Sequence, residues 1–163
     1  MRDQWLTPAQ QKAWRSYLVG SQLLWERLDR DLKTAHGLSL AEYEVMVRLS
    51  EAPDGQLRMT DLAKALCHSR SRVTHTVKRM QVDGLVFRAS ALNDGRGVVA
   101  VMSDMGWQRL REAAPTHVQG VREHFLAHLS AEDFELIGQA FDAVADPLVE
   151  DNPEVDLRLS STD

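Results

Sequence analysis

The segment from residue 60 to residue 102 constrains the fold most, because it places two short helices directly before a β-hairpin. Thr60 and Ser69 each stand where an N-cap is expected, in front of a short helical pattern. Two β-rich runs, residues 85–90 and 98–102, flank an Asn-Asp-Gly turn, which is a strong hairpin signal. Two short helices joined by a few residues and followed by a hairpin form a winged helix-turn-helix.

Long helical patterns lie on both sides of this module. Upstream, Thr7 and Pro8 begin a capping box, and the helix behind it is predicted to end at Gly37. Ser39 and Glu42 form a second capping box, for a helix that ends before a Pro-Asp-Gly turn.

Two more helices are predicted downstream of the hairpin. Ser103 and Ser130 are placed to cap them. Pro115 lies inside the first of these patterns and predicts a kink or a break there. The second helix is expected to stop near Pro147.

These patterns predict a mostly α fold with a small β-wing, in one domain over residues 1–163. The winged helix-turn-helix, residues 55–102, is embedded between two helical dimerisation regions, residues 7–52 and 103–147. The acidic tail, residues 148–163, is expected to be disordered. The first helix would be roughly 40 Å long, so a small domain cannot cover it and one stripe of it is expected to find a partner.

The charge of the chain is unevenly distributed. The 163 residues carry a formal net charge of −5. Residues 58–97 hold eight Lys and Arg against three Asp, a net +5, which leaves −10 on the remainder. A short basic segment inside an acidic chain is typical of a nucleic-acid-binding module on an acidic scaffold.

The second helix of the module has one apolar and one cationic side. A helical wheel puts Val73, Val77, Met80 and Gly84 on the buried side. The residues expected at double-stranded DNA are Ser69, Arg70, Ser71, Arg72, Thr74, His75, Lys78 and Arg79. Those with short or aromatic polar side chains (Ser71, Thr74, His75) suit base edges, and the four cations (Arg70, Arg72, Lys78, Arg79) suit phosphates. A solvated helix that is basic without function is the alternative.

The predicted hairpin carries Asp94 and Arg96 at its tip. An arginine on a thin hairpin can enter a minor groove, and the neighbouring carboxylate can orient it. The alternative is an ordinary Asp-Gly turn with a solvated arginine.

Many of these residues belong to a motif pattern that occurs in a known protein family. It comprises residues 69–80, Gly84-Leu85-Val86, Arg88, Asp94-Gly95-Arg96, Val101 and Gly106. Over residues 7–147 the sequence resembles the MarR family of bacterial transcriptional regulators. The resemblance implies a homodimer with interlocked terminal helices, which binds palindromic duplex DNA, usually as a repressor, and often holds a small ligand. His75 stands where many members have a longer residue such as Arg, so no base preference is carried over.

The resemblance also implies a pocket for a small aromatic or phenolic effector near the first two helices. The candidate lining residues are Trp14, Tyr17, Trp25, His36, Tyr43 and Met46. By spacing alone, side chains of these types more often form a dimer core than a ligand cage.

Other candidate sites are weaker. Cys67, the single cysteine, is expected to be a small buried residue, with oxidant sensing as the alternative. His117, His124 and His128 could align on one helix, but matching metal ligands are missing, so neither a metal nor a cofactor is expected.

No motif of an enzyme is present, and an enzyme is not expected. No apolar run is long enough for a membrane span, and the first residues do not read as a secretory signal. The protein is therefore expected in the bacterial cytoplasm, on the nucleoid when bound to DNA. The alternative function is a winged helix used for dimerisation or protein contact without DNA binding.

Overall fold

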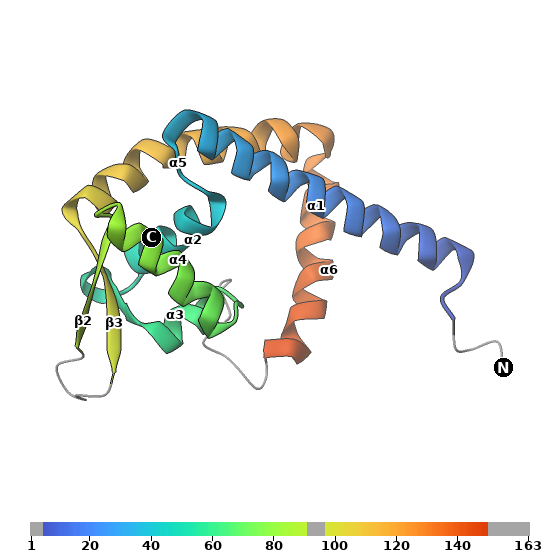
Figure 1. Cartoon of the computed structure of the whole chain (residues 1–163). Helices are drawn as coiled ribbons and strands as arrows, with labels where there is room; N and C mark the ends of the chain where they lie inside the picture. Colours follow the sequence, from blue (N-terminus) through green and yellow to red (C-terminus); the bar gives the residue numbers. More distant parts are fainter. Residues whose placement is uncertain (1–4, 91–96, 150–163) are drawn as a thin grey trace.

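The winged helix-turn-helix lies below two long helices in Figure 1, a computed structural model that describes residues 5–90 and 97–149. The elements follow in the order α1 (Pro8–His36), α2 (Leu40–Glu51), η1 (Pro53–Gly55), β1 (Gln56–Arg58), α3 (Met59–Ala65), α4 (Arg70–Val82), β2 (Val86–Ser90), β3 (Val98–Met102), α5 (Asp104–His124), η2 (Leu126–His128) and α6 (Ala131–Val149). The predicted fold class, mostly α with a small β-wing, is confirmed.

Two capping boxes set the starts of α1 and α2, as predicted. The backbone N–H of Thr7 donates to Gln10 Oε1 at 2.9 Å, and Thr7 Oγ1 accepts from the backbone of Gln10. Ser39 and Glu42 make the same exchange at α2. Gly37 ends α1 in the left-handed conformation, with φ +63°, which a glycine adopts without strain.

The predicted start of α3 is wrong. Arg58, not Thr60, occupies the N-cap, and the Thr60 hydroxyl donates instead to Asp61 Oδ1 at 3.3 Å. The reason is β1, whose three residues run directly into the helix and leave no separate capping residue. β1 was not predicted, because three residues are too few to show an alternating pattern.

The sheet has the order β1-β3-β2, and both pairs are antiparallel. Ala100 at the centre of β3 pairs with Leu57 of β1 and with Arg88 of β2. The predicted hairpin is confirmed as β2 and β3 (Figure 1), and β1 pairs with β3 on the side away from β2.

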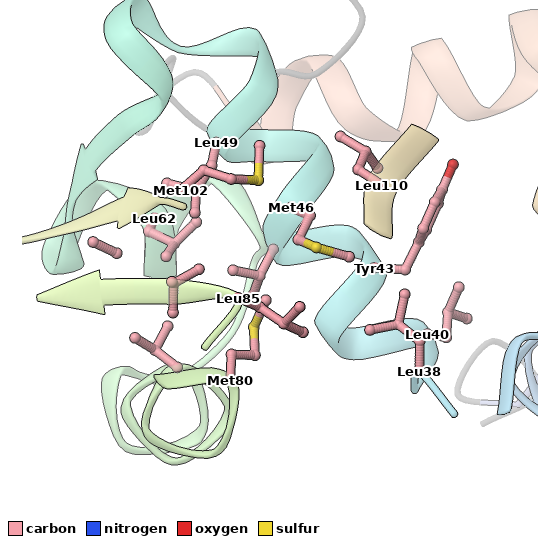
Figure 2. Close-up of a cluster of buried hydrophobic side chains, with 14 of the residues drawn as sticks. Leu38, Leu40, Tyr43, Met46, Leu49, Leu62, Met80, Leu85, Met102 and Leu110 are labelled. Atoms are coloured by element: carbon pink, nitrogen blue, oxygen red, sulfur yellow. The ribbon is translucent and has the colours of Figure 1, made fainter. Parts of the chain in front are cut away.

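The core gathers side chains from α1, α3, α4, α5 and the strands around α2 (Figure 2). Val73, Val77 and Met80 of α4 are buried there, as the helical wheel predicted. Gly84 is a correction: it is exposed, because α4 ends at Val82 and the glycine forms the turn behind it with φ +73°.

α5 begins against the module and continues as one helix to His124. The predicted break at Pro115 is absent. The proline ring is exposed, so it costs a backbone hydrogen bond without a clash in the core, and the packing of α5 on α1 holds the helix together.

Gly106 lets the start of α5 approach the strands closely. A Cβ at this position would overlap the backbone oxygen of Leu85 and would lie 2.9 Å from Met102 Cγ. We therefore expect Gly106→Ala to lower the free energy of unfolding by about 2–4 kcal/mol, measured by chemical denaturation. Gly20→Ala is the control, because nothing lies within 4 Å of its Cβ position. Equal stability of Gly106→Ala and the wild-type protein would contradict this packing.

α6 has little support from its own protomer. Among the residues that the structure describes, none of α6 is buried. It leaves the end of α5 and passes α1, where Tyr17 and Phe141 approach with ring centroids 5.4 Å apart (Figure 1). The exposed apolar side chains of the two helices include Trp14, Leu18, Val19, Leu23, Phe134, Leu136, Val144 and Leu148. Large apolar side chains left exposed on two helices of one protomer are typical of an interface.

Candidate nucleic-acid interface

The exposed side of α4 is cationic and polar. Its buried stripe fixes the rotation of the helix, and Ser69 fixes its start by accepting from the backbone of Arg72 at 3.3 Å. The predicted DNA-binding residues of this segment are all exposed: Ser69, Arg70, Ser71, Arg72, Thr74, His75, Lys78 and Arg79. No acidic residue occurs in the first turn. The exposed surface therefore offers hydrogen-bond donors and positive charge without a competing carboxylate from the helix itself.

Arg79 differs from the other cations of α4 in its contacts. Its Nε donates to Glu42 Oε1 at 2.8 Å and its Nη2 to Ser39 Oγ at 3.3 Å, both at the start of α2. The Arg79 side chain is 50% exposed, whereas the Glu42 side chain is only 8% exposed. Sequence analysis identified Glu42 as a capping residue only, because its contact with Arg79 joins positions 37 residues apart.

Glu42 is held as a carboxylate. Burial alone would raise its pKa, but hydrogen bonds from Ser39 and Arg79, together with the Arg79 charge, outweigh burial and place the pKa below the ordinary value. The ion pair between α4 and α2 therefore persists through the neutral pH range.

The wing is described only in part. β2 and β3 place the hairpin beside α4, and Arg88 of β2 is exposed. Asp94 and Arg96, which the sequence places at the tip, lie outside the described residues. Their role at the minor groove stays a prediction.

The six candidate effector residues do not line one pocket. Met46 and Tyr43 are buried, the first inside the core and the second against His117, with ring centroids 4.6 Å apart. The His36 ring pairs with Thr116 through Nε2 and Oγ1 at 2.8 Å. Trp14 and Tyr17 pack on each other near α6, with ring centroids 5.5 Å apart. Trp25 lines a hollow that none of the other five lines.

Trp25 lines an open hollow of about 500 Å³ between α1, α2 and α4. The lining consists of Trp25, Glu26, Asp29, Leu40, Ala41, Glu44, His68 and Arg72. Burial raises the pKa of Glu44 despite the Arg48 and Arg72 charges. Burial and the Arg72 charge lower the pKa of His68. Residues of the long helix α1 and a cation of α4, Arg72, therefore line the same hollow.

Cys67 is exposed, which corrects the expectation of a small buried residue. It lies in the turn between α3 and α4, where its backbone has φ +50°.

The three histidines of the downstream region have separate surroundings. His124 Nε2 lies 3.0 Å from Asp31 Oδ2, the His117 ring packs on Tyr43, and His128 is exposed in η2. Burial lowers the pKa of His117. Across residues 5–90 and 97–149, no three side chains of His, Cys, Asp or Glu form a group that could hold a metal ion. No helix of this part of the chain is long and apolar enough to cross a membrane.

Comparison with known proteins finds a family model and several relatives that are similar to this chain. A model described as MarR family matches residues 36–97. The MarR family transcriptional regulator Sco3205 of Streptomyces coelicolor, solved in complex with DNA, is 39% identical, with a TM-score of 0.84 over 88% of this chain and 94% of that chain. AbsC of the same organism, also a MarR family regulator, is 39% identical, with a TM-score of 0.83 over 89% and 97%. The homoprotocatechuate degradative operon repressor of Escherichia coli is 28% identical over 65% of this chain and 70% of its own length.

Proposed function

The chain belongs to the MarR family of transcriptional regulators, and from this we propose that it represses transcription as a homodimer bound to a palindromic DNA operator. The exposed cationic side of α4 is the observation that carries the proposal. Two relatives support it. Sco3205 was solved in complex with DNA, and the Escherichia coli relative is named as the repressor of an operon.

Two α4 helices, one from each protomer, would enter successive major grooves about 34 Å apart. Ser71, Thr74 and His75 lie on the exposed side of α4 and would meet base edges. Arg70, Arg72 and Lys78 would bind phosphates, and Asp94 and Arg96 of the wing would act at the minor groove.

The second protomer would cover the apolar surface of α1 and α6. Trp14 and Leu23 of α1 are 51% and 60% exposed, and Val144 and Leu148 of α6 are 55% and 70% exposed. A monomer would leave this surface in water, whereas interlocked α1 and α6 helices of two copies would bury it. A dimer also provides the two-fold symmetry that a palindromic operator requires.

The hollow beside Trp25 is the proposed effector site. Its occupant would touch both α1 and Arg72 of α4, so binding could shift the recognition helix. Three carboxylates, Glu26, Asp29 and Glu44, line it and would repel an aromatic carboxylate. A neutral phenol or another aromatic compound without negative charge suits this lining better.

Selection of bound duplexes from a random DNA pool tests the proposed function. We expect enrichment of a palindrome whose half-sites are centred about 10 base pairs apart. No enrichment would favour the alternative, a winged helix that serves dimerisation or protein contact only. Enrichment of a single, non-repeated half-site would contradict the homodimer.

A further inference from the structure

Arg79 makes a forked contact that joins the last turn of α4 to the first turn of α2. Nε lies 2.8 Å from Glu42 Oε1, and Nη2 lies 3.3 Å from Ser39 Oγ. Two of its three guanidinium nitrogens are therefore engaged inside the protein. A planar guanidinium suits such a fork, because its N–H groups are fixed relative to one another.

Glu42 is a rigid anchor for this contact. Its side chain is 8% exposed, and its other oxygen, Oε2, accepts from Ser39 N at 2.8 Å and from Ser39 Oγ at 2.6 Å. Both oxygens are thus occupied, one by the cap of α2 and one by Arg79. A nearly buried carboxylate with this many donors has little freedom to move.

The connection between α1 and α2, which Arg79 contacts, is also bound by α5. Arg109 of α5 donates through Nη1 to the backbone oxygen of His36 at 2.7 Å, just before Gly37. The end of α1, the start of α2 and α5 therefore meet where Arg79 attaches α4. α4 is then held in two ways: by its buried stripe of Val73, Val77 and Met80, and by the Arg79 fork in its last turn.

We infer that Arg79 is a positioning residue, which sets the angle of α4 through Glu42 so that Ser71, Thr74 and His75 meet the bases. The inference rests on the proposed function, and it changes the role that the sequence predicted for Arg79, a phosphate contact. It assigns operator specificity to an acidic residue, Glu42, that is too buried to touch DNA.

The two roles of Arg79 predict opposite effects of Glu42→Gln. The glutamine keeps an oxygen for the α2 cap but turns an amide N–H toward the guanidinium, so the fork is lost. If Arg79 is a phosphate contact, its release and the loss of a negative charge should both tighten binding to any DNA. If Arg79 positions α4, binding to the operator should weaken although the protein becomes less acidic.

The test compares Glu42→Gln, Arg79→Gln and Lys78→Gln. Each full-length variant is titrated by fluorescence anisotropy, over a salt series, with the selected operator duplex and with a random duplex of equal length. For Glu42→Gln and Arg79→Gln we expect operator affinity to fall about tenfold, random-duplex affinity to change less than about threefold, and the salt slope to stay near the wild-type value. Lys78→Gln, the phosphate-contact control, should weaken both duplexes alike and flatten the slope by about 1.8 for the dimer.

Several results would overturn the inference. Tighter or unchanged operator binding by Glu42→Gln is one, and an Arg79→Gln slope as flat as that of Lys78→Gln is another. Circular dichroism checks that each variant is folded. If the altered cap unfolds Glu42→Gln, the Arg79→Gln variant decides the question alone, through its salt slope and its ratio of operator to random-duplex affinity. Wild-type protein that binds neither duplex would overturn the proposed function itself, a result distinct from all of these.

Discussion

Replacing both Arg72 and Lys78 with glutamine should lower operator affinity on the order of a thousandfold at moderate salt. Both side chains are exposed on α4, and the dimer would lose four phosphate contacts. Four charge-assisted contacts at about 1 kcal/mol each account for this loss. The log–log salt slope, expected near −9 or steeper for the wild-type dimer, should flatten by about 3.6. Fluorescence anisotropy over a salt series measures both quantities.

The matched control removes the same two charges elsewhere. Arg30 of α1 and Arg111 of α5 are exposed and lie outside the winged helix-turn-helix. The variant with both replaced by glutamine should keep operator affinity within about threefold, because charges more than about 10 Å from the DNA are screened at physiological salt. An equal loss in the control would mean that net charge, rather than the α4 surface, governs binding.

Introducing glutamate at both Leu136 and Val144 should convert the protein to a monomer. The two side chains are 54% and 55% exposed on α6, so neither change disturbs the core of the protomer. In a dimer that covers α6, each carboxylate would enter an apolar interface at a cost of several kcal/mol. Sedimentation velocity should show the dimer dissociating at least a thousandfold more readily, and operator binding should fall with it.

Met105→Glu controls for the added charge. Met105 is 53% exposed at the start of α5, away from α6. Its variant should sediment as the wild-type protein does. A dimeric Leu136→Glu, Val144→Glu protein would exclude α6 from the interface and with it the proposed arrangement of two protomers.

The elements that sequence predicted correctly are set by local chemistry. The capping boxes at Thr7 and Ser39 and the apolar stripe of α4 depend on residues three or four positions apart. The buried stripe alone then determined which side of α4 faces outward. This is why the cationic surface could be predicted before its structure was known.

Contacts between distant residues account for what the sequence could not predict. Arg79 reads as one more exposed cation, and only the folded chain brings Glu42 to it. Met46 is of a residue type that suits a ligand pocket, but it is buried in the core. Of the six predicted effector residues, Trp25 alone lines the hollow between α1, α2 and α4. Cys67 is exposed in a turn with a positive φ, which no local pattern signals at a non-glycine residue.

In the proposed dimer, the lack of buried residues in α6 would make regulation depend on the amount of protein in the cell. A helix with no fully buried residue in its own protomer would gain most of its packing energy on association, so its stability would rise with protein concentration. Below the dissociation constant of the dimer, the amount of dimer rises with the square of the protein concentration. Doubling the supply of protein would then quadruple the species able to occupy the operator, and the regulated gene would respond to a threshold of expression rather than in proportion to it.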